Sequence, residues 1–327
     1  MNSTRAQALL GADRTAATDG PRPRGATSIV QVIPARYPYR WIGGSIALLL
    51  CVWGLYTVAT SPNITWSVVA AYILNGTILE GMRLTIVLTI VSLTVGVILG
   101  TVLATMRLSN NPVLQVISSA YITTFRGTPL LIQIIFWFNI ALVVPVIRIG
   151  WPQAGFGFET QTNVIMTAMT AAILALGLNE AAYMAEIVRG GIISVPKGQD
   201  EAASSLGLTK RQAMWRVVLP QAVRAIVPPT GNQLIIVLKN TSLVSVIAAR
   251  ELLTATQQIY STNFYTIELL IVAAGWYMVM TAVATILQGY LESRLEYSLR
   301  SRTHPFHKRF VRSLLSIGRK NYMEVRG

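Results

Sequence analysis

Long apolar runs separated by shorter polar segments make up most of the sequence. The first run, residues 41–60, has no charged residue and is long enough to cross a bilayer as a helix. Five further runs follow, at about residues 83–106, 117–146, 164–188, 223–246 and 267–291. The pattern predicts an all-α integral membrane protein with six transmembrane helices.

Three of these runs contain residues that shape helices. The run 117–146 exceeds the thickness of the hydrocarbon core, so we expect it to tilt or to break near Gly127 to Pro129. The pair Pro228-Pro229 is expected to interrupt the fifth run. In the second run, Gly96 and Gly100 stand four residues apart, a spacing that lets helix backbones approach closely in lipid.

The positive residues indicate how the chain is oriented. Of 27 Lys and Arg residues, 23 lie in the two tails or in and around the loops after the second and fourth runs. Because positive residues accumulate on the cytoplasmic side of a membrane, we expect both termini and the loop after the fourth run to be cytoplasmic.

The segments outside the runs differ in kind. Residues 1–40 carry too little apolar surface to offset the entropy of ordering, which predicts a flexible cytoplasmic tail. Residues 61–80 mix Trp66 and Tyr72 with polar residues, which favours a helix lying against the outer leaflet. Residues 296–327 form a basic cytoplasmic tail, either disordered or amphipathic and bound to membrane lipid.

The composition excludes several other classes of protein. The chain has 53% apolar and only 12% charged residues, which is too apolar for an ordinary soluble domain. Most of it is therefore expected to lie in lipid. The net charge of +14 is spread over tails and loops, which argues against a nucleic-acid partner. Cys51 is the single cysteine and both histidines lie in the tail, so we expect no disulfide framework and no metal site. A Gly-x-Ser-x-Gly motif is also absent, which argues against an intramembrane hydrolase.

The longest polar interruption lies between the fourth and fifth runs and predicts a helix-turn-helix elbow. Glu201-Ala202-Ala203 suits a short helix that packs closely against another surface, and Gly207 can end this helix in the left-handed conformation. Thr209 with Gln212 predicts a capping box that opens a second helix, which Pro220 is expected to close or kink. The spacing alone leaves an ordinary solvated loop as the alternative.

The elbow also carries a resemblance to a known family. Glu201-Ala202-Ala203, three residues, Gly207, nine residues and then Val217-x-Leu219-Pro220 are similar to the EAA loop of ABC-importer permeases, with Val217 in place of the usual Ile. Other stretches look like the polar amino-acid uptake branch of that family, namely Phe125–Leu131, Asn179–Glu186, Ser194–Gln199, Gly231–Gln233 and Lys239–Leu243. The resemblance runs from about residue 81 to about residue 295.

The resemblance implies an architecture and a set of partners. Residues 81–295 would be the permease domain, a core of five helices with the type I ABC-importer permease fold, preceded by an additional transmembrane helix at 41–60. The cytoplasmic EAA coupling loop, 194–220, would lie in a cleft of an ABC ATPase subunit. Its coupling residues would be Glu201, Ala202, Ala203, Gly207, Leu219 and Pro220. The family works as a permease dimer, from two copies or two paralogues, in the bacterial inner membrane, and receives solute from an extracytoplasmic solute-binding protein.

ATP would be used by the partner and not by this chain. No stretch reads Gly-x-x-x-x-Gly-Lys-Ser/Thr, so the sequence offers no phosphate-binding loop of its own. We therefore expect a transport subunit that binds no cofactor and is not itself an enzyme.

A second set of candidate residues lies inside the apolar runs, where charged side chains are costly. The residues expected to line a substrate path are Asn179, Glu180, Tyr183, Glu186, Arg126, Lys239, Asn240 and Ser242. Glu180 is the favoured residue for facing a substrate or a partner helix. For Glu186 and Arg126 a structural role is favoured, since Glu186 can pair with Arg189 at i, i+3 and Arg126 can extend to the headgroups. Lys239 and Asn240 also fit an interfacial position.

Two functions remain for such a chain. The first is the permease subunit of an ATP-binding-cassette importer, which moves a polar amino acid or related small solute across the cytoplasmic membrane. The alternative is an ion-coupled secondary transporter or channel, in which Glu180, Glu186 and Lys239 would serve a proton relay. The elbow argues against the alternative, because a self-sufficient carrier needs no docking site.

Overall fold

The computed structural model describes residues 38–151 and 156–297. These residues form two compact units, divided between Ser61 and Pro62. The tails predicted for 1–40 and 296–327 lie outside the described residues, except that positions 38–40 begin a helix and positions 296–297 end one. The described part of the first unit is the helix α1, Pro38–Ala59, whose stretch Ile42–Ala59 is long and apolar enough to cross a membrane.

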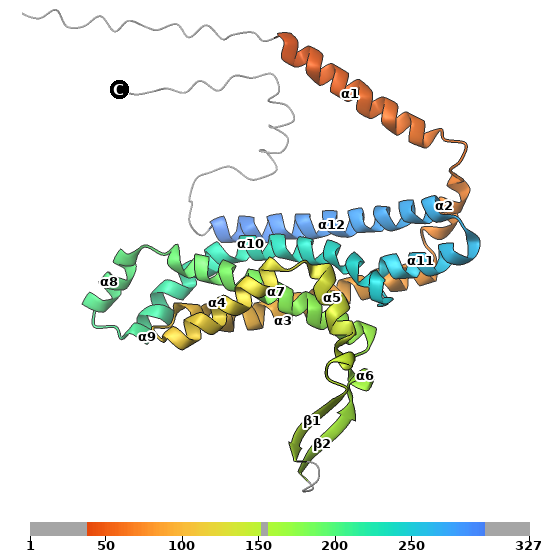
Figure 1. Cartoon of the computed structure of the whole chain (residues 1–327). Helices are drawn as coiled ribbons and strands as arrows, with labels where there is room; N and C mark the ends of the chain where they lie inside the picture. Colours follow the sequence, from red (N-terminus) through yellow and green to blue (C-terminus); the bar gives the residue numbers. More distant parts are fainter. Residues whose placement is uncertain (1–37, 152–155, 298–327) are drawn as a thin grey trace, which may run out of the picture. The chain divides into compact units, whose positions relative to one another are not determined.

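The second unit is mainly helical, and its long helices lie side by side (Figure 1). Its α-helices are α2 (Trp66–Tyr72), α3 (Gly76–Leu108), α4 (Pro112–Gly127), α5 (Leu130–Phe138), α6 (Thr162–Ile165), α7 (Ala168–Ile193), α8 (Lys197–Ser205), α9 (Lys210–Ala213), α10 (Leu219–Asn240), α11 (Leu252–Asn263) and α12 (Thr266–Tyr297). Shorter elements are the 3-10 helices η1 (Ile140–Leu142) and η4 (Thr241–Ile247), the π-helix η3 (Met214–Val218), and the strands β1 (Val146–Trp151) and β2 (Phe156–Gln161).

The expected number of six spans is not confirmed by length and composition. Among the described residues, four helices are long and apolar enough to cross a membrane: those at 42–59, 76–108, 168–193 and 266–294. A fifth span is counted if the helical run Lys210–Ile247 and α11, which meet at 44°, are taken together.

The break expected near Gly127 to Pro129 is confirmed, and the helix after the break, α5, ends at Phe138 and does not reach residue 146. α4 ends at Gly127, and Thr128 is extended with φ −111° and ψ 140°. A proline disfavours the helical region for the residue before it, so Thr128 cannot continue the helix. Gln133 Nε2 then donates to the carbonyls of Phe125 and Thr128 at 2.9 and 3.1 Å, which satisfies acceptors left over at the break.

An antiparallel hairpin follows, which the all-helical prediction did not include. β1 and β2 pair from Val146 opposite Gln161 to Trp151 opposite Phe156. The base is closed by Thr162, whose amide donates to the Pro145 carbonyl at 2.9 Å and whose hydroxyl donates to the Val144 carbonyl. The fourth apolar run therefore does not enter its long helix at Val164 but at Ala168.

Two other expectations about helix boundaries need correction. The pair Pro228-Pro229 does not interrupt its span, because both residues lie inside α10. α12 packs against α10 at this level, where Gln288 Nε2 donates to the Pro228 carbonyl at 3.4 Å. The predicted interfacial segment 61–80 is shorter than expected, since Asn75 caps α3 by accepting from the Thr77 amide at 2.9 Å.

The close approach expected at Gly96 and Gly100 is confirmed, and α7 is the helix that approaches. A Cβ atom built on Gly100 would lie 2.6 Å from Met184 Cβ and 2.8 Å from the Ala181 carbonyl oxygen. A Cβ atom on Gly96 would lie 2.6 Å from Glu180 Cγ. Helices gain little hydrophobic driving force from one another in lipid, so such backbone contact is a main source of their association.

We predict that Gly100→Ala destabilises the α3–α7 pair. The added methyl group would meet backbone atoms of α7, which cannot rotate away, and overpacking of this kind costs about 1–3 kcal/mol. The thermal midpoint of the purified protein in detergent should fall by several degrees. Gly275→Ala is the matched control, because no atom lies within 4 Å of a Cβ built at that position of α12. Equal midpoints for the two variants would contradict this account.

Candidate functional site

The helix-turn-helix elbow has the local structure that its sequence predicts. α8 ends at Ser205, and Gly207 adopts the left-handed conformation with φ +78°. The Leu208 amide donates to the Ala203 carbonyl at 3.1 Å, and the Gly207 amide to the Ser204 carbonyl at 3.0 Å. This pair of bonds is the Schellman arrangement, which satisfies carbonyls at a helix end.

The second helix of the elbow begins with the predicted capping box. Thr209 Oγ1 accepts from the Gln212 amide at 3.4 Å, and Gln212 Oε1 accepts from the Thr209 amide at 2.9 Å. These reciprocal bonds satisfy two amides at the start of α9.

Pro220 does not close this second helix, contrary to one of the two outcomes expected for it. α9 continues through the π-helix η3 into α10, and Pro220 stands in the first turn of α10. A proline inside a continuous helix removes one backbone donor, and the wider turn of η3 lies just before it. The second helix of the elbow is therefore the beginning of a long helix that runs into the bundle.

The elbow presents small and apolar groups at its surface. Glu201, Ala202 and Gly207 are exposed, whereas Ala203 is buried. Leu206 is 82% exposed and Trp215 is 63% exposed, and the motif did not single out either residue.

A cavity of about 530 Å³ lies between α4, α5, α7 and α10. Five of the eight predicted path residues line it, namely Arg126, Asn179, Glu180, Tyr183 and Asn240. Gln233 also lines this cavity, although sequence reasoning did not select it. Gln233 stands in the family-like stretch Gly231–Gln233, but its hydrogen bond to Glu180, 53 residues away, has no signal in the local sequence.

Glu180 is the buried acid of the cavity. Its side chain is 3% exposed and packs against Gly96 of α3. One carboxyl oxygen, Oε2, accepts from Gln233 Nε2 at 3.3 Å, while the buried Oε1 has no hydrogen-bond partner among the described residues. A buried carboxyl oxygen without a donor is costly, so this position suits a donor supplied by a ligand.

An amide network fixes the wall of the cavity at the α4–α5 break. Asn179 Nδ2 donates to the Phe125 carbonyl at 3.0 Å and to Gln133 Oε1 at 3.1 Å. Nearby, the Arg126 guanidinium lies over the ring of Tyr183, 5.2 Å from its centroid. Such a cation over an aromatic face is attracted by the ring quadrupole. The cavity thus has a buried acid from α7 and a guanidinium from α4.

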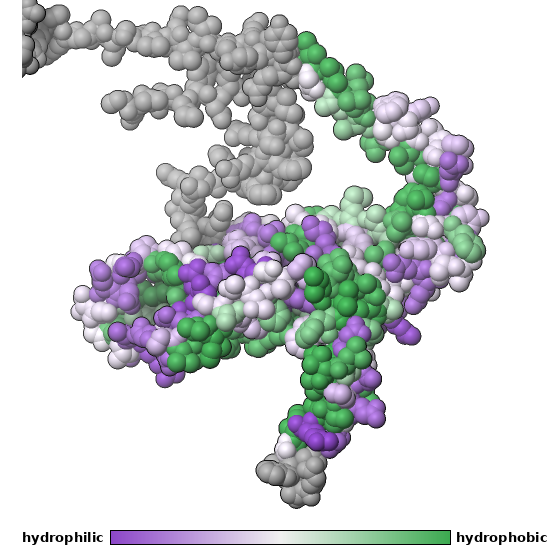
Figure 2. Space-filling view, in the orientation of Figure 1, coloured by the Kyte–Doolittle hydropathy of each residue, from purple (hydrophilic) through white to green (hydrophobic). Residues whose placement is uncertain are grey.

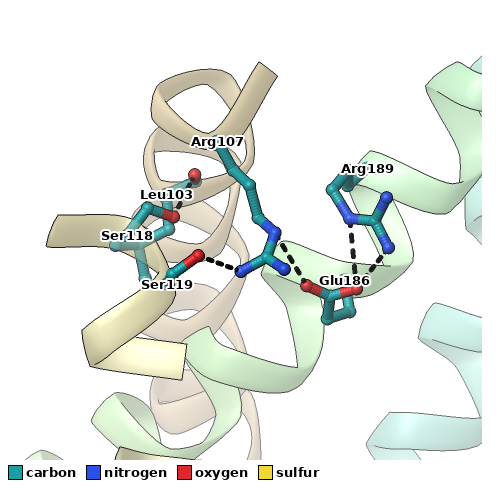
Figure 3. A network of polar contacts seen from close by, with 6 residues as sticks. All are labelled: Leu103, Arg107, Ser118, Ser119, Glu186 and Arg189. Atoms are coloured by element: carbon teal, nitrogen blue, oxygen red, sulfur yellow. Dashed lines mark hydrogen bonds and ion pairs between the residues drawn. The ribbon is translucent and has the colours of Figure 1, made fainter. Parts of the chain in front are cut away.

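Glu186 does not line the cavity but belongs to an ion network (Figure 3). Its Oε2 accepts from Arg189 Nη2 at 2.6 Å, which confirms the predicted i, i+3 pair. Its Oε1 lies 3.5 Å from Arg107 Nε of α3, and Arg107 Nη1 donates to Ser119 Oγ of α4 at 2.8 Å. The network ties α3, α4 and α7 together, and its Arg107 arm is a contact that local spacing does not reveal.

Lys239 and Ser242 are not among the residues that line the cavity. Lys239 is exposed, and Ser242 Oγ donates to the Lys239 carbonyl at 2.8 Å. A hydroxyl that bonds back to the preceding turn is common near a helix end. Within residues 38–151 and 156–297, no group of three or more His, Cys, Asp or Glu residues could hold a metal ion.

The sequence is similar to those of permease proteins from amino-acid transport systems. The chain is 38% identical over 282 residues to an arginine transport system permease protein of Corynebacterium glutamicum, with 86% of each chain covered. It is 35% identical to an L-cystine transport system permease protein of Bacillus subtilis, over 66% of this chain and 85% of the relative.

Solved structures share the fold. A crystal structure of an amino acid ABC transporter with histidines is 36% identical, with a TM-score of 0.57, over 67% of this chain and 94% of that chain. The MetNI methionine ABC transporter, in an inward-facing conformation, is 18% identical with a TM-score of 0.54, which is a likeness of fold alone.

The family model described as "Binding-protein-dependent transport system inner membrane component" matches residues 96–297, which include α7, the elbow and α10. The chain therefore belongs to this family of multi-pass inner-membrane transport components.

Proposed function

We propose that this chain is the permease subunit of an ATP-driven importer and moves a polar amino acid or related small solute through the cavity beside Glu180. Relatives named for the transport of arginine, L-cystine and glutamate/aspartate support a solute of this class. The ATP would be hydrolysed by a separate cytoplasmic ATPase subunit. An extracytoplasmic solute-binding protein and a second permease copy or paralogue would complete the transporter, with both termini and the elbow in the cytoplasm.

One observation carries the proposal: the helices on either side of the elbow are the helices that hold the cavity. α7 ends at Ile193, four residues before α8 begins, and it carries Asn179, Glu180 and Tyr183. The helical run that starts at Lys210 leads into α10, which carries Gln233 and Asn240. Movement of α8 would therefore reach both walls of the cavity through the helices connected to its two ends.

The geometry also supports a way of holding the solute. The free Oε1 of Glu180 would accept from an ammonium or guanidinium group, and the Arg126 guanidinium would pair with a carboxylate. Asn179, Gln233 and Asn240 add amide groups to the same wall. These residues and roles are our proposal for the path. Three other predicted path residues do not line the cavity, namely Glu186, Lys239 and Ser242. We propose that they support the helices around the path and do not contact the solute.

Energy coupling provides the first test of this function. Purified protein with its co-purifying subunits, reconstituted in liposomes, should take up solute only when ATP is supplied together with the binding protein. Uptake should stop when ATP is removed while an imposed proton gradient is kept. Continued uptake under the gradient alone would favour an ion-coupled carrier instead.

Gly207→Val should uncouple ATP hydrolysis from uptake. A β-branched residue is strained in the left-handed conformation at φ +78°, by about 1–2 kcal/mol, so the end of α8 would shift. We expect normal membrane insertion, retained ATPase activity and a large loss of uptake in proteoliposomes. Gly198→Ala serves as the control, because Gly198 lies on α8 itself, in open space and without a positive φ. Undiminished uptake by Gly207→Val would count against the elbow as the coupling element.

Glu180→Gln should weaken solute handling without weakening assembly. Gln has the same shape and fits against Gly96, but it replaces the acidic group offered to the solute with an amide. Hydrogen bonds to charged groups contribute about 1.5–3 kcal/mol, so the KM for uptake should rise roughly tenfold or more. Glu80→Gln is the control, since Glu80 forms an exposed pair with Arg83 away from the cavity. Unchanged uptake kinetics in Glu180→Gln would remove this residue from the path.

A further inference from the structure

The β1–β2 hairpin has two chemically different faces. Side chains alternate along each strand, and directly opposed residues share a face. Arg148 and Glu159 are opposed and form an ion pair, with Arg148 Nε 3.0 Å from Glu159 Oε2. Ile149 opposes Phe158, and Ile147 opposes Thr160, on the other face. One face is therefore ionic and the other mainly apolar.

The apolar face is uncovered in the described structure. Ile149 is 57% exposed and Phe158 is 47% exposed. Segments next to the hairpin expose more apolar side chains, among them Leu142, Val143 and Val164. Figure 2 shows hydrophobic residues continuing from the helices into the hairpin. A two-stranded hairpin is at best marginally stable alone in water, so this surface requires a covering.

The position of the hairpin along the chain indicates what covers it. β2 ends at Gln161, and α7, a helix of span length, begins at Ala168. The 26 residues of α7 extend about 39 Å, against about 30 Å for the hydrocarbon core, so the hairpin emerges where a span reaches the membrane boundary. The elbow follows the opposite end of α7.

The direction of the hairpin fits the same boundary. In Figure 1 it extends away from the bundle at a steep angle to α10 and α12. Transmembrane helices lie roughly along the membrane normal. An element at a steep angle to them therefore runs along the membrane surface. Both strands of the hairpin are edge strands with unpaired backbone groups, which the hydrocarbon interior does not tolerate. The interface between headgroups and acyl chains accommodates both features, with the Arg148–Glu159 pair toward water.

We propose that the hairpin is a lipid-binding anchor whose Ile147, Ile149 and Phe158 face enters the headgroup–acyl boundary at the end of α7 opposite the elbow. Three apolar side chains buried at the headgroup–acyl boundary would bind the hairpin to the membrane surface, although the hairpin does not cross the bilayer. The anchor would fix the level of the α5–α7 connection, and hence of one wall of the cavity, relative to the bilayer.

Single-cysteine labelling tests the anchor in the full chain with its co-purifying subunits. In a Cys51→Ser background, Ile149→Cys and Phe158→Cys report on the apolar face, and Gln161→Cys reports on the ionic face of the same hairpin. Each variant is labelled with a polarity-sensitive fluorophore and reconstituted in vesicles of phosphatidylcholine and phosphatidylglycerol. A nitroxide on the lipid acyl chain near the headgroup should quench labels at 149 and 158 several-fold more than the label at 161. A water-soluble quencher should show the reverse order.

A second variant checks that the hairpin persists. Ile149→Cys combined with Phe158→Cys places two thiols directly opposite one another, so mild oxidation should join them if the register is kept. Failure to form this bond, or equal access of the aqueous quencher to all three labels, would overturn the anchor. Shielding from both quenchers at 149 and 158 would also overturn it, because protein would then cover the face. None of these readouts depends on uptake, so they are independent of the proposed solute path.

Discussion

Close backbone contact between α3 and α7 is the constraint on which the rest of the structure depends. Gly96 and Gly100 leave no room for a side chain, and Gly177 is similarly pressed by Val95. In lipid, where apolar side chains meet an equally apolar solvent, such contact replaces the hydrophobic drive of a soluble core. It also places Glu180 between α3 and α10, so the packing of the bundle and the chemistry of the cavity share one set of residues.

The bundle contains two polar clusters, one around Glu186 and one around Glu180, and they differ in how they contact the packed helices. Glu186 is neutralised by arginines from two helices, which makes it part of the frame (Figure 3). Glu180 keeps one oxygen free beside a cavity and receives only a long bond from Gln233. The ion pairs of Glu186 tie the helices together, although its Oε1 accepts no hydrogen bond. Glu180 forms no ion pair among the described residues, and it is the acid that we propose contacts the solute.

Features that depend on neighbouring residues could be predicted from the sequence, whereas contacts between distant helices could not. Gly207, Thr209 and Gln212 act on backbone groups within a few residues, so the elbow could be predicted in detail. The break at Thr128-Pro129 followed from proline sterics in the same way. By contrast, the Gly- and Pro-containing stretch 150–157 marks a turn but does not show that paired strands flank it. Gln233 and Arg107 acquire roles only when distant helices meet. The continuity of α10 through Pro220 and Pro228-Pro229 likewise depends on its tertiary setting.

The two adjacent prolines inside α10 have a mechanical consequence. Lacking N–H groups, Pro228 and Pro229 cannot donate to the carbonyls of Arg224 and Ala225, so the helix loses two successive rungs at one level. That level lies between the elbow end of α10 and its cavity residues Gln233 and Asn240. Under the coupling role that we propose for the elbow, a push at the elbow end of α10 would bend the helix at this level and would move the end that carries Gln233 and Asn240.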